Sequence, residues 1–173
     1  MSENRIINLR RAGIEDLTLL EYWDQQQHVF DADPDDDWNW AYELTRFPSW
    51  REQLIAEIAG RPIGFIQIID PAEEETHYWG TIAPNLRAID IWIGEKSDLG
   101  KGYGTEMMKQ AIERCFLDPK VRSILIDPLA SNKAAIRFYE RLGFQFEENR
   151  QFGTSVCQVY KLIRKNWETH KGQ

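Results

Sequence analysis

Hydrophobic residues repeat along the N-terminal part of the chain at two different intervals. After Gly13 they recur three or four positions apart, which predicts an amphipathic helix with one apolar face made of Ile14, Leu17, Leu20 and Trp23. Residues 5–10 before it alternate as a β-strand does. Two largely apolar runs follow at 54–59 and 63–69, and because Gly60-Arg61-Pro62 joins them we expect an antiparallel hairpin.

The middle of the chain predicts a strand, a glycine-rich turn and a helix in succession. In the strand over 86–94 one face is apolar, and the other carries Asp90 and Trp92. An apolar stripe then predicts a helix that ends at Phe116, and residues 121–126 predict the next strand. This order implies a right-handed crossover between two parallel strands.

The C-terminal third predicts one more helix and two strands. Ser131 and Asn132 are typical N-terminal caps for a helix over 133–142, which Gly143 would end. Residues 144–148 and 156–163 predict the last strands. With 173 residues the chain can bury one core, so we expect a single α/β (α+β) domain over 1–173.

Charge narrows the classes of partner. The formal net charge of −7 argues against nucleic-acid binding and is compatible with a cationic small-molecule amine. Five of the seven residues at 31–37 are Asp, which predicts a surface loop. That loop is either a solvated turn or an acidic lip for a cationic ligand, with Trp38 and Trp40 as flat apolar faces beside it. Glu73-Glu74-Glu75, followed by Tyr78 and Trp79, forms a second acidic and aromatic stretch.

The remaining composition suggests a cytoplasmic protein without a metal. Cys115 and Cys157 lie in predicted core elements and have no metal-ligand spacing, as expected of thiols in a reducing compartment. The first residues lack the apolar core of a signal peptide, and no run of 18 apolar residues suggests a membrane span. His28, His77 and His170 are far apart in sequence, so a zinc site or catalytic triad has little support.

The glycine-rich turn predicts an anion site. Gly100, Gly102 and Gly104 let successive backbone N–H groups turn toward one point, at the start of a helix with its positive dipole end. A Walker loop would need Gly-Lys-Ser/Thr after a four-residue gap, and a Rossmann turn would need a glycine at Met107. Neither motif is present, so the turn alone identifies a phosphate but not its carrier.

A second motif narrows the choice of carrier. Leu99-Gly-Lys-Gly-Tyr-Gly-Thr105 and, downstream, Asp127-Pro-x-x-Ser-Asn-x-x-Ala-Ile-x-x-Tyr-Glu-x-x-Gly-Phe144 together resemble the cofactor motifs of the GNAT superfamily of N-acetyltransferases. The resemblance implies acetyl-CoA (CoA) as cofactor and a mixed sheet of about six to seven strands, antiparallel at its N-terminal part, with splayed parallel central strands flanked by helices. The residues that it implies for acetyl-CoA binding are Trp92, Ile93, Leu99, Gly100, Lys101, Gly102, Tyr103, Gly104, Thr105, Asn132, Ala135 and Tyr139.

Within the superfamily, Ala88-Ile-Asp90, the glycine segment and Ser131-Asn-x-x-Ala-Ile-Arg137 look like the aminoglycoside 6′-N-acetyltransferases. That branch usually has Gln where this chain has Ile91, and a sister branch that acylates siderophore precursors typically has His at the position of Asp90. The Asp favours a cationic amine substrate and, with it, a role in antibiotic resistance. The residues expected to bind that substrate are Asp90, Asp127, Trp79, Glu74, Glu75 and Trp38.

Acetyl transfer requires a neutral amine, a donor for the carbonyl oxygen and a proton for the leaving thiolate. We expect Asp90 and Asp127 to bind the ammonium, with one of them removing its proton directly or through water. An ordinary Asp pKa of about 3.9 makes a poor base unless burial raises it. A backbone N–H near Trp92 or Ile93 could bind the carbonyl oxygen, and Tyr139 could donate to the sulfur. Asp127 could instead be a purely structural carboxylate at the turn.

Three functions therefore stay open from the sequence. The first is direct acetyl transfer to the 6′-amine of aminoglycosides in a ternary complex. The second is acylation of another amine, such as a siderophore precursor, a polyamine or a protein N-terminus. The third is a CoA-binding protein without turnover. The sequence is compatible with a monomer or a homodimer.

Overall fold

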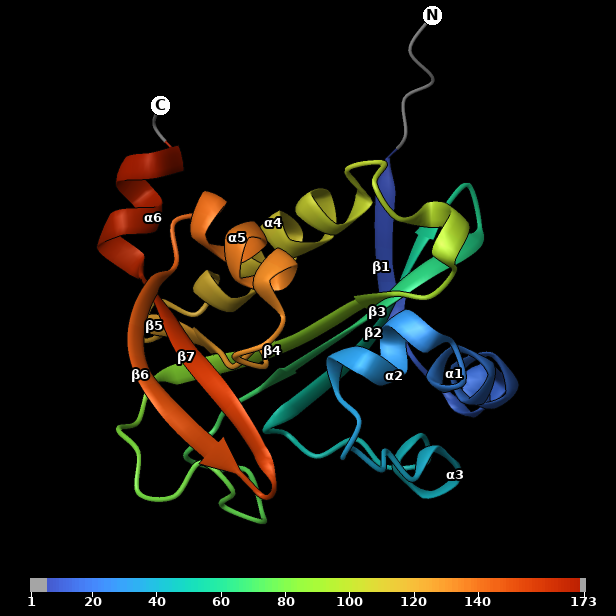
Figure 1. Cartoon of the computed structure of the whole chain (residues 1–173), viewed down its shortest axis with the longest axis horizontal. Coiled ribbons are helices and arrows are strands. Elements are labelled where there is room, and N and C mark those ends of the chain that lie inside the picture. The colour runs from blue at the N-terminus through green and yellow to red at the C-terminus, as the bar shows by residue number, and fades with distance from the viewer. Residues whose placement is uncertain (1–5, 172–173) are drawn as a thin grey trace, which may run out of the picture. The chain divides into compact units, whose positions relative to one another are not determined.

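The computed structural model describes residues 6–171, which fold around a mixed seven-stranded sheet (Figure 1). The strand order is β1-β2-β3-β4-β5-β7-β6. The pairs β1–β2, β5–β7 and β6–β7 are antiparallel, whereas β4 and β5 are parallel. The predicted mixed sheet and the parallel crossover are therefore confirmed. The strands are β1 (Ile7–Arg11), β2 (Arg51–Ile58), β3 (Arg61–Ile69), β4 (Leu86–Ile93), β5 (Ser123–Ile126), β6 (Gln145–Phe152) and β7 (Ser155–Ile163).

The chain forms two compact units, each built from two separated segments. The first unit contains residues 1–67 and 90–110, and the second contains residues 68–89 and 111–173. The boundary falls inside β3, β4 and the helix α4 (Tyr103–Phe116). The single domain expected from chain length stays a prediction.

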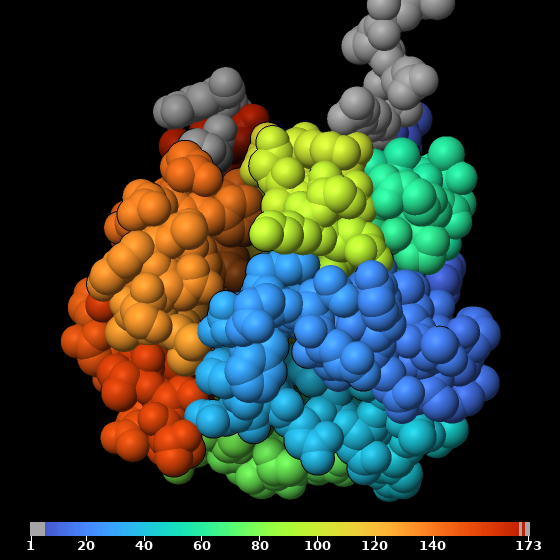
Figure 2. All heavy atoms as spheres, turned by 45° about the vertical axis from the view of Figure 1, so that its right-hand side comes forward, coloured from blue at the N-terminus to red at the C-terminus, as the bar shows by residue number. Residues whose placement is uncertain are grey.

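Short helices follow β1 in the first unit. The predicted amphipathic helix begins as a 3₁₀ turn at Ile14–Asp16 and continues as α1 (Leu17–Asp24). After it come α2 (Gln27–Ala32) and α3 (Trp40–Glu43). The acidic loop expected over 31–37 was placed too early, because Asp31 belongs to α2 and accepts a hydrogen bond from Gln27 one turn earlier. Figure 2 shows this helical segment, in blue to cyan, packed as one continuous layer.

The hairpin of β2 and β3 closes one position earlier than expected. Its two turn residues are Ala59 and Gly60, with φ of 49° and 78°, as the favoured two-residue hairpin turns require. Arg61 and Pro62 already belong to β3, where a proline at a strand start is tolerated. Further along β3, a Cβ on Gly64 would meet Met107 Cε at 2.6 Å. The missing side chain therefore lets α4 lie close against this strand.

The second unit contains the crossover's end and the C-terminal hairpin. Helix α5 (Lys133–Arg141) is followed by Gly143 at φ 100°, which confirms the predicted helix stop. A final helix, α6 (Arg164–Lys171), was not predicted. Its first residue is anchored, because the Arg164 guanidinium donates to the backbone carbonyls of Phe116, Asp118 and Val121 at 2.6–3.1 Å.

Two further sequence predictions concern buried thiols and metal ligands. Cys115 and Cys157 are both buried and unoxidised, as expected of core thiols. Between residues 6 and 171, no cluster of His, Cys, Asp and Glu side chains is arranged to hold a metal ion. Within the same range, no helix combines the length and the apolar character needed to cross a membrane. The side chain of His170 lies outside the described residues.

Candidate acyl-transfer site

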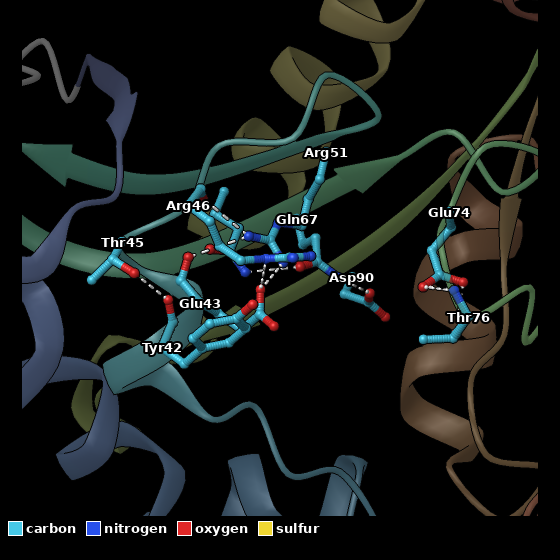
Figure 3. A network of polar contacts seen from close by, with 10 residues as sticks. Tyr42, Glu43, Thr45, Arg46, Arg51, Gln67, Glu74, Thr76 and Asp90 are labelled. Atoms are coloured by element: carbon cyan, nitrogen blue, oxygen red, sulfur yellow. Dashed lines mark hydrogen bonds and ion pairs between the residues drawn. The ribbon is translucent and has the colours of Figure 1, made fainter.

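A row of polar side chains crosses three neighbouring strands of the first unit. Gln53 on β2 donates from Nε2 to Gln67 Oε1 on β3 at 3.0 Å. Gln67 in turn donates from Nε2 to Asp90 Oδ2 on β4 at 3.2 Å (Figure 3). Both glutamines are 9% exposed, and Asp90 is partly buried. The predicted carboxylate Asp90 therefore lies on a face of the sheet, and Gln67 binds one of its oxygens.

Beside this polar row lies an aromatic one. Phe65 and Trp92 lie two residues from Gln67 and Asp90 along β3 and β4, and therefore on the same face of the sheet. Their rings stack with centroids 4.5 Å apart. Trp38, in the loop before α3, meets both of these rings edge-on at 5.6 Å and 5.2 Å and stacks on Trp40 at 5.0 Å. Asp90 is therefore next to a wall of flat apolar rings, to which the predicted Trp38 and Trp92 both contribute.

The environment of Asp90 changes its proton affinity. Burial and, to a smaller extent, the nearby Asp33 carboxylate raise the pKa of Asp90 to about 7, against the lowering effect of the hydrogen bond from Gln67. Asp33 comes from the acidic loop after α2. The carboxyl group can thus exchange a proton near neutral pH, which an ordinary Asp could not do. The acidic loop acts on the site through this charge.

Helix α3 is held in place by ionic contacts. Glu43, its last residue, pairs with Arg51 at the start of β2 and with Arg46 at 3.0 Å (Figure 3). The Arg51 guanidinium also donates to the backbone carbonyls of Glu43 and Arg46 at 3.2 Å each. At the other end of the helix, Trp40 Nε1 donates to Asp24 Oδ2 at 2.6 Å. These contacts fix the Trp40 ring on which Trp38 stacks.

The glycine-rich turn adopts the conformation of an anion-binding loop at two of its three glycines. Gly100 and Gly102 have φ of 73° and 81°, and a Cβ on either would meet nothing within 4 Å. Gly104, by contrast, already lies in the first turn of α4, so it does not contribute a left-handed residue as the expectation of three equivalent glycines implied. Two glycines and the helix start therefore form the turn.

A buried carboxylate anchors this turn to the sheet. Asp98 is 3% exposed and accepts two hydrogen bonds from the Arg61 guanidinium, at 2.8 Å and 3.1 Å. Lys101 Nζ lies 4.0 Å from the same carboxylate. The hydrogen bonds from Arg61 hold the pKa of Asp98 below its usual value, against the effect of desolvation. The carboxylate therefore stays ionised and ties the turn to the start of β3.

The end of β4, just before the glycine-rich turn, is held by hydrogen bonds and packing. His28 Nε2 on α2 lies 2.8 Å from the backbone oxygen of Ile93. The Gly94 N–H donates to the Ile63 carbonyl at 2.9 Å. Gly94 has no side chain where the Trp23 ring packs, and any Cβ there would clash with that ring. The strand segment from Asp90 to Ile93 is therefore held from α1, α2 and β3.

The second unit holds the other predicted catalytic and cofactor residues. Asp127 follows β5 directly, in a turn that is bound to β7, because the Gln158 N–H donates to the Pro128 carbonyl at 2.9 Å. Asn132 caps α5 as predicted, accepting the Ala135 N–H through Oδ1 at 3.2 Å. Tyr139 is 9% exposed, and its ring meets that of Phe144 at 5.8 Å.

The second acidic and aromatic stretch is organised by its own contacts. Glu74 is 5% exposed and accepts from the Thr76 N–H at 2.9 Å and the Thr76 hydroxyl at 2.8 Å (Figure 3). Trp79 is 2% exposed, packs edge-on against Phe152 at 5.0 Å, and its backbone carbonyl accepts from Arg150. Glu74 is thus engaged within the loop and Trp79 is engaged by β6, so Glu75 is the exposed one of the three substrate ligands predicted in this stretch.

Several residues that support the predicted ones were not predicted. They are Gln53, Gln67, His28, Asp98 and Arg61, and they act on Asp90, on Ile93 or on the glycine turn. One signal was available: Gln67 interrupts an otherwise apolar strand at the same parity as Phe65. A buried amide there needs a partner, and Asp90 on the neighbouring predicted strand was the available one.

Known proteins are similar to this chain in both sequence and fold. A family model described as an acetyltransferase (GNAT) domain matches residues 14–152. The aminoglycoside N(6′)-acetyltransferase type 1 of Klebsiella pneumoniae is 32% identical over 160 residues, which cover 83% of this chain and 76% of that protein. A kanamycin resistance protein of Rhizobium radiobacter is 44% identical over 73 residues, 42% of this chain and 62% of that protein.

Among solved structures, the aminoglycoside acetyltransferase AAC(6′)-Ib in complex with coenzyme A and kanamycin matches with a TM-score of 0.85. It is 27% identical in sequence, and the match covers 96% of this chain and 99% of that one. The chain therefore belongs to the GNAT family of acetyltransferases.

Proposed function

We propose that this protein is an acetyl-CoA-dependent aminoglycoside 6′-N-acetyltransferase that transfers the acetyl group directly in a ternary complex. The observation that carries the proposal is Asp90, a partly buried carboxylate of raised pKa beside the Trp38 and Trp92 rings. Relatives named for aminoglycoside acetylation and kanamycin resistance support the same substrate class. A cationic sugar has both charged amines and apolar ring faces, which a carboxylate and aromatic rings can bind together.

The glycine turn fits the pyrophosphate of acetyl-CoA. Its left-handed residues Gly100 and Gly102 leave open space where side chains would stand, and the start of α4 adds backbone N–H groups and a positive dipole end. Lys101 lies in the same turn and can add a positive charge. When bound, acetyl-CoA supplies the acetyl group as a thioester. The turn's part is to hold and orient its phosphates.

In the second unit the roles follow the family motif. Asn132 uses Oδ1 as the cap of α5, so its amide N–H groups are the donors with which it can bind a pantetheine carbonyl. The Tyr139 hydroxyl is the proposed donor to the CoA sulfur, and Asp127 is the proposed second carboxylate for the substrate. Glu74 and Trp79 are engaged by protein contacts, so Glu75 is the residue of this stretch that is proposed to bind the substrate.

Asp90 has two tasks on the acceptor. As a carboxylate it binds the substrate ammonium and lowers its energy of desolvation next to the aromatic wall. Because its pKa is about 7, it can also take the amine proton as the nitrogen becomes nucleophilic. An Asp of ordinary pKa would perform the first task alone, since it is too weak a base for the second.

The proposal is tested by measuring CoA release from acetyl-CoA with kanamycin, tobramycin, spermidine and N-hydroxylysine at equal concentrations. We expect turnover with the aminoglycosides and little with the other amines. Preferential turnover of spermidine or N-hydroxylysine would replace the substrate class and leave the family unchanged. Calorimetric binding of acetyl-CoA without turnover of any amine would instead indicate a binding protein.

A further inference from the structure

The buried pair Gln53 and Gln67 is unusual in its position. Both side chains are 9% exposed and lie in strands whose neighbours on the same face, Ile55 and Phe65, are fully buried apolar residues. Burying two amides is costly unless each finds partners. Their hydrogen bonds form a chain from Gln53 through Gln67 to Asp90, at 3.0 Å and 3.2 Å. Packing alone would be served as well by leucine at both positions.

The row of hydrogen bonds from Gln53 to Asp90 has a donor-to-acceptor direction, which follows from its first bond. Gln67 Oε1 accepts the proton of Gln53 Nε2, so the amide of Gln67 presents its N–H group and not its oxygen to Asp90. With the Gln67 amide reversed, two NH₂ groups would meet at Gln53 and two oxygens would meet at Asp90. The bond from Gln53 therefore favours the orientation in which Gln67 donates to the carboxylate.

On this basis, and on the proposed function, we infer that Gln53 and Gln67 are positioning residues for the acceptor amine. They occupy Oδ2 of Asp90 and fix the carboxylate plane, so that Oδ1 alone faces the substrate ammonium. In Figure 3 the second oxygen of Asp90 points away from Gln67. A carboxylate held by one oxygen can bind the ammonium and remove its proton at a single defined place.

The other charged groups on the surrounding elements do not orient the Asp90 carboxylate. The ionised Asp33 carboxylate is an acceptor only, so it repels the Asp90 carboxylate and cannot donate to it. Other titratable groups on α1, α2 and α3 are engaged elsewhere, among them Asp24 with Trp40, Asp31 with Gln27, His28 with the Ile93 oxygen, and Glu43 with Arg46 and Arg51. Gln67 therefore supplies the hydrogen bond that favours the charged form of Asp90.

The decisive variants are Gln67→Leu and Gln53→Leu, with Gln110→Leu as the matched control. Gln110 also donates its amide, to the Ile7 carbonyl at 2.9 Å in the same unit, but does not contact the site. In Gln67→Leu, we expect the midpoint of the acidic limb of kcat/KM to rise by about half to one pH unit, because the bond favouring the carboxylate is lost. Above this limb, kcat should fall about tenfold with a smaller change in the KM for the amine.

Gln53→Leu should act in the same direction with a smaller effect, since it removes only the orientation of Gln67. Gln110→Leu should leave the midpoint of the limb where it is in the unmodified protein. An unmoved midpoint in Gln67→Leu, with activity lowered equally at every pH, would mean that the glutamines are only structural. If Gln67→Leu does not fold, Gln67→Met and Gln53→Leu decide by the same criterion.

A second readout separates this inference from the proposed function. Titration of the ¹³C-labelled Asp carboxyl groups of the full chain by NMR, without substrate, reports the Asp90 midpoint directly, and the Asp90→Asn variant identifies its signal. We expect the midpoint to be higher in Gln67→Leu than in the unmodified protein and unchanged in Gln110→Leu. Identical midpoints in all three proteins would overturn the inference. A shifted midpoint without turnover of any amine would overturn the proposed function and leave the link between Gln67 and Asp90 standing.

Discussion

At the scale of single residues, one carboxylate combines two properties that normally exclude each other. Asp90 is sufficiently buried to have a pKa of about 7, yet the hydrogen bond from Gln67 keeps its ionised form accessible. The aromatic wall beside it strengthens electrostatic attraction by displacing water. In the proposed reaction, the substrate ammonium and its base therefore meet where their attraction is stronger than in bulk solvent.

Replacing Asp90 by Asn tests this directly. We expect kcat/KM for kanamycin to fall by about 100-fold or more, because a base and an ion-pair partner are lost together. In the unmodified protein kcat/KM should rise as the pH increases through about 7, since the deprotonated carboxylate is the active form. That limb should be missing in Asp90→Asn. Equal steady-state rates in the two proteins would remove Asp90 from the mechanism.

Trp38 gives a prediction on binding rather than chemistry. Its ring lies on the aromatic wall and contacts Trp92 and Phe65. Trp38→Ala should raise the KM for kanamycin about tenfold, through loss of about 1.4 kcal/mol of contact, and change kcat less. Tyr42→Ala, at an exposed ring of the same unit, should leave the KM unchanged. A KM that rises equally in both variants would contradict a substrate-binding role of Trp38.

At the scale of elements, different residues of the turn between β4 and α4 attach it to the sheet and form its proposed phosphate-binding surface. Asp98 and Arg61 fix the turn to the sheet through an ion pair whose carboxylate is buried, whereas Gly100 and Gly102 leave the surface of the turn bare. A bare left-handed turn followed by a helix start exposes backbone N–H groups, which is what a pyrophosphate requires.

Gly60 provides a matched control for Gly102. Their φ angles are 78° and 81°, and a Cβ on either would meet nothing within 4 Å, but Gly60 lies in the β2–β3 turn. Gly60→Ala and Gly102→Ala should each lower the free energy of unfolding by about 1 kcal/mol, because alanine strains a left-handed residue. Only Gly102→Ala should weaken acetyl-CoA binding, about fivefold by calorimetry. Equal acetyl-CoA affinities in the two variants would argue against the turn as the phosphate site.

The regular elements were largely predictable from the sequence, and the supporting contacts were not. The strand with Asp90 and Trp92, the cap at Asn132 and the stop at Gly143 each follow from local pattern. The link from Gln53 to Asp90 depends on the register of β2 against β3 and of β3 against β4, which the pattern within each strand does not define. The hydrogen bonds that Thr76 donates to Glu74 also depend on the conformation of their loop, which residue type alone does not reveal.

At the scale of the whole molecule, the raised pKa of Asp90 links activity to stability. Between about pH 4 and pH 7 the folded chain keeps a proton on Asp90 that the unfolded chain has lost, so stability falls as the pH rises through this window. Asp16 and Asp98 have lowered pKa values, so their stabilising contributions are present above about pH 4 and are lost only in stronger acid.

Asp90→Asn should therefore be more stable than the unmodified protein at pH 8 and closer to it at pH 5. We expect the difference in the free energy of unfolding at pH 8 to be about 1 to 4 kcal/mol, which chemical denaturation at both pH values would measure. The comparison between the two proteins removes the contributions of the titrating groups that do not interact with Asp90. A difference that does not change between pH 5 and pH 8 would mean that burial does not perturb Asp90.

The proposed function is tested most directly by identifying the product formed from kanamycin and acetyl-CoA. After incubation with the protein, two-dimensional NMR of the purified product locates the acetyl group on a particular nitrogen. We expect a singly acetylated kanamycin, modified at the 6′-amine, and a strongly reduced yield with the Asp90→Asn variant. Acetylation at another amine, or no product although acetyl-CoA binds, would contradict the proposed function.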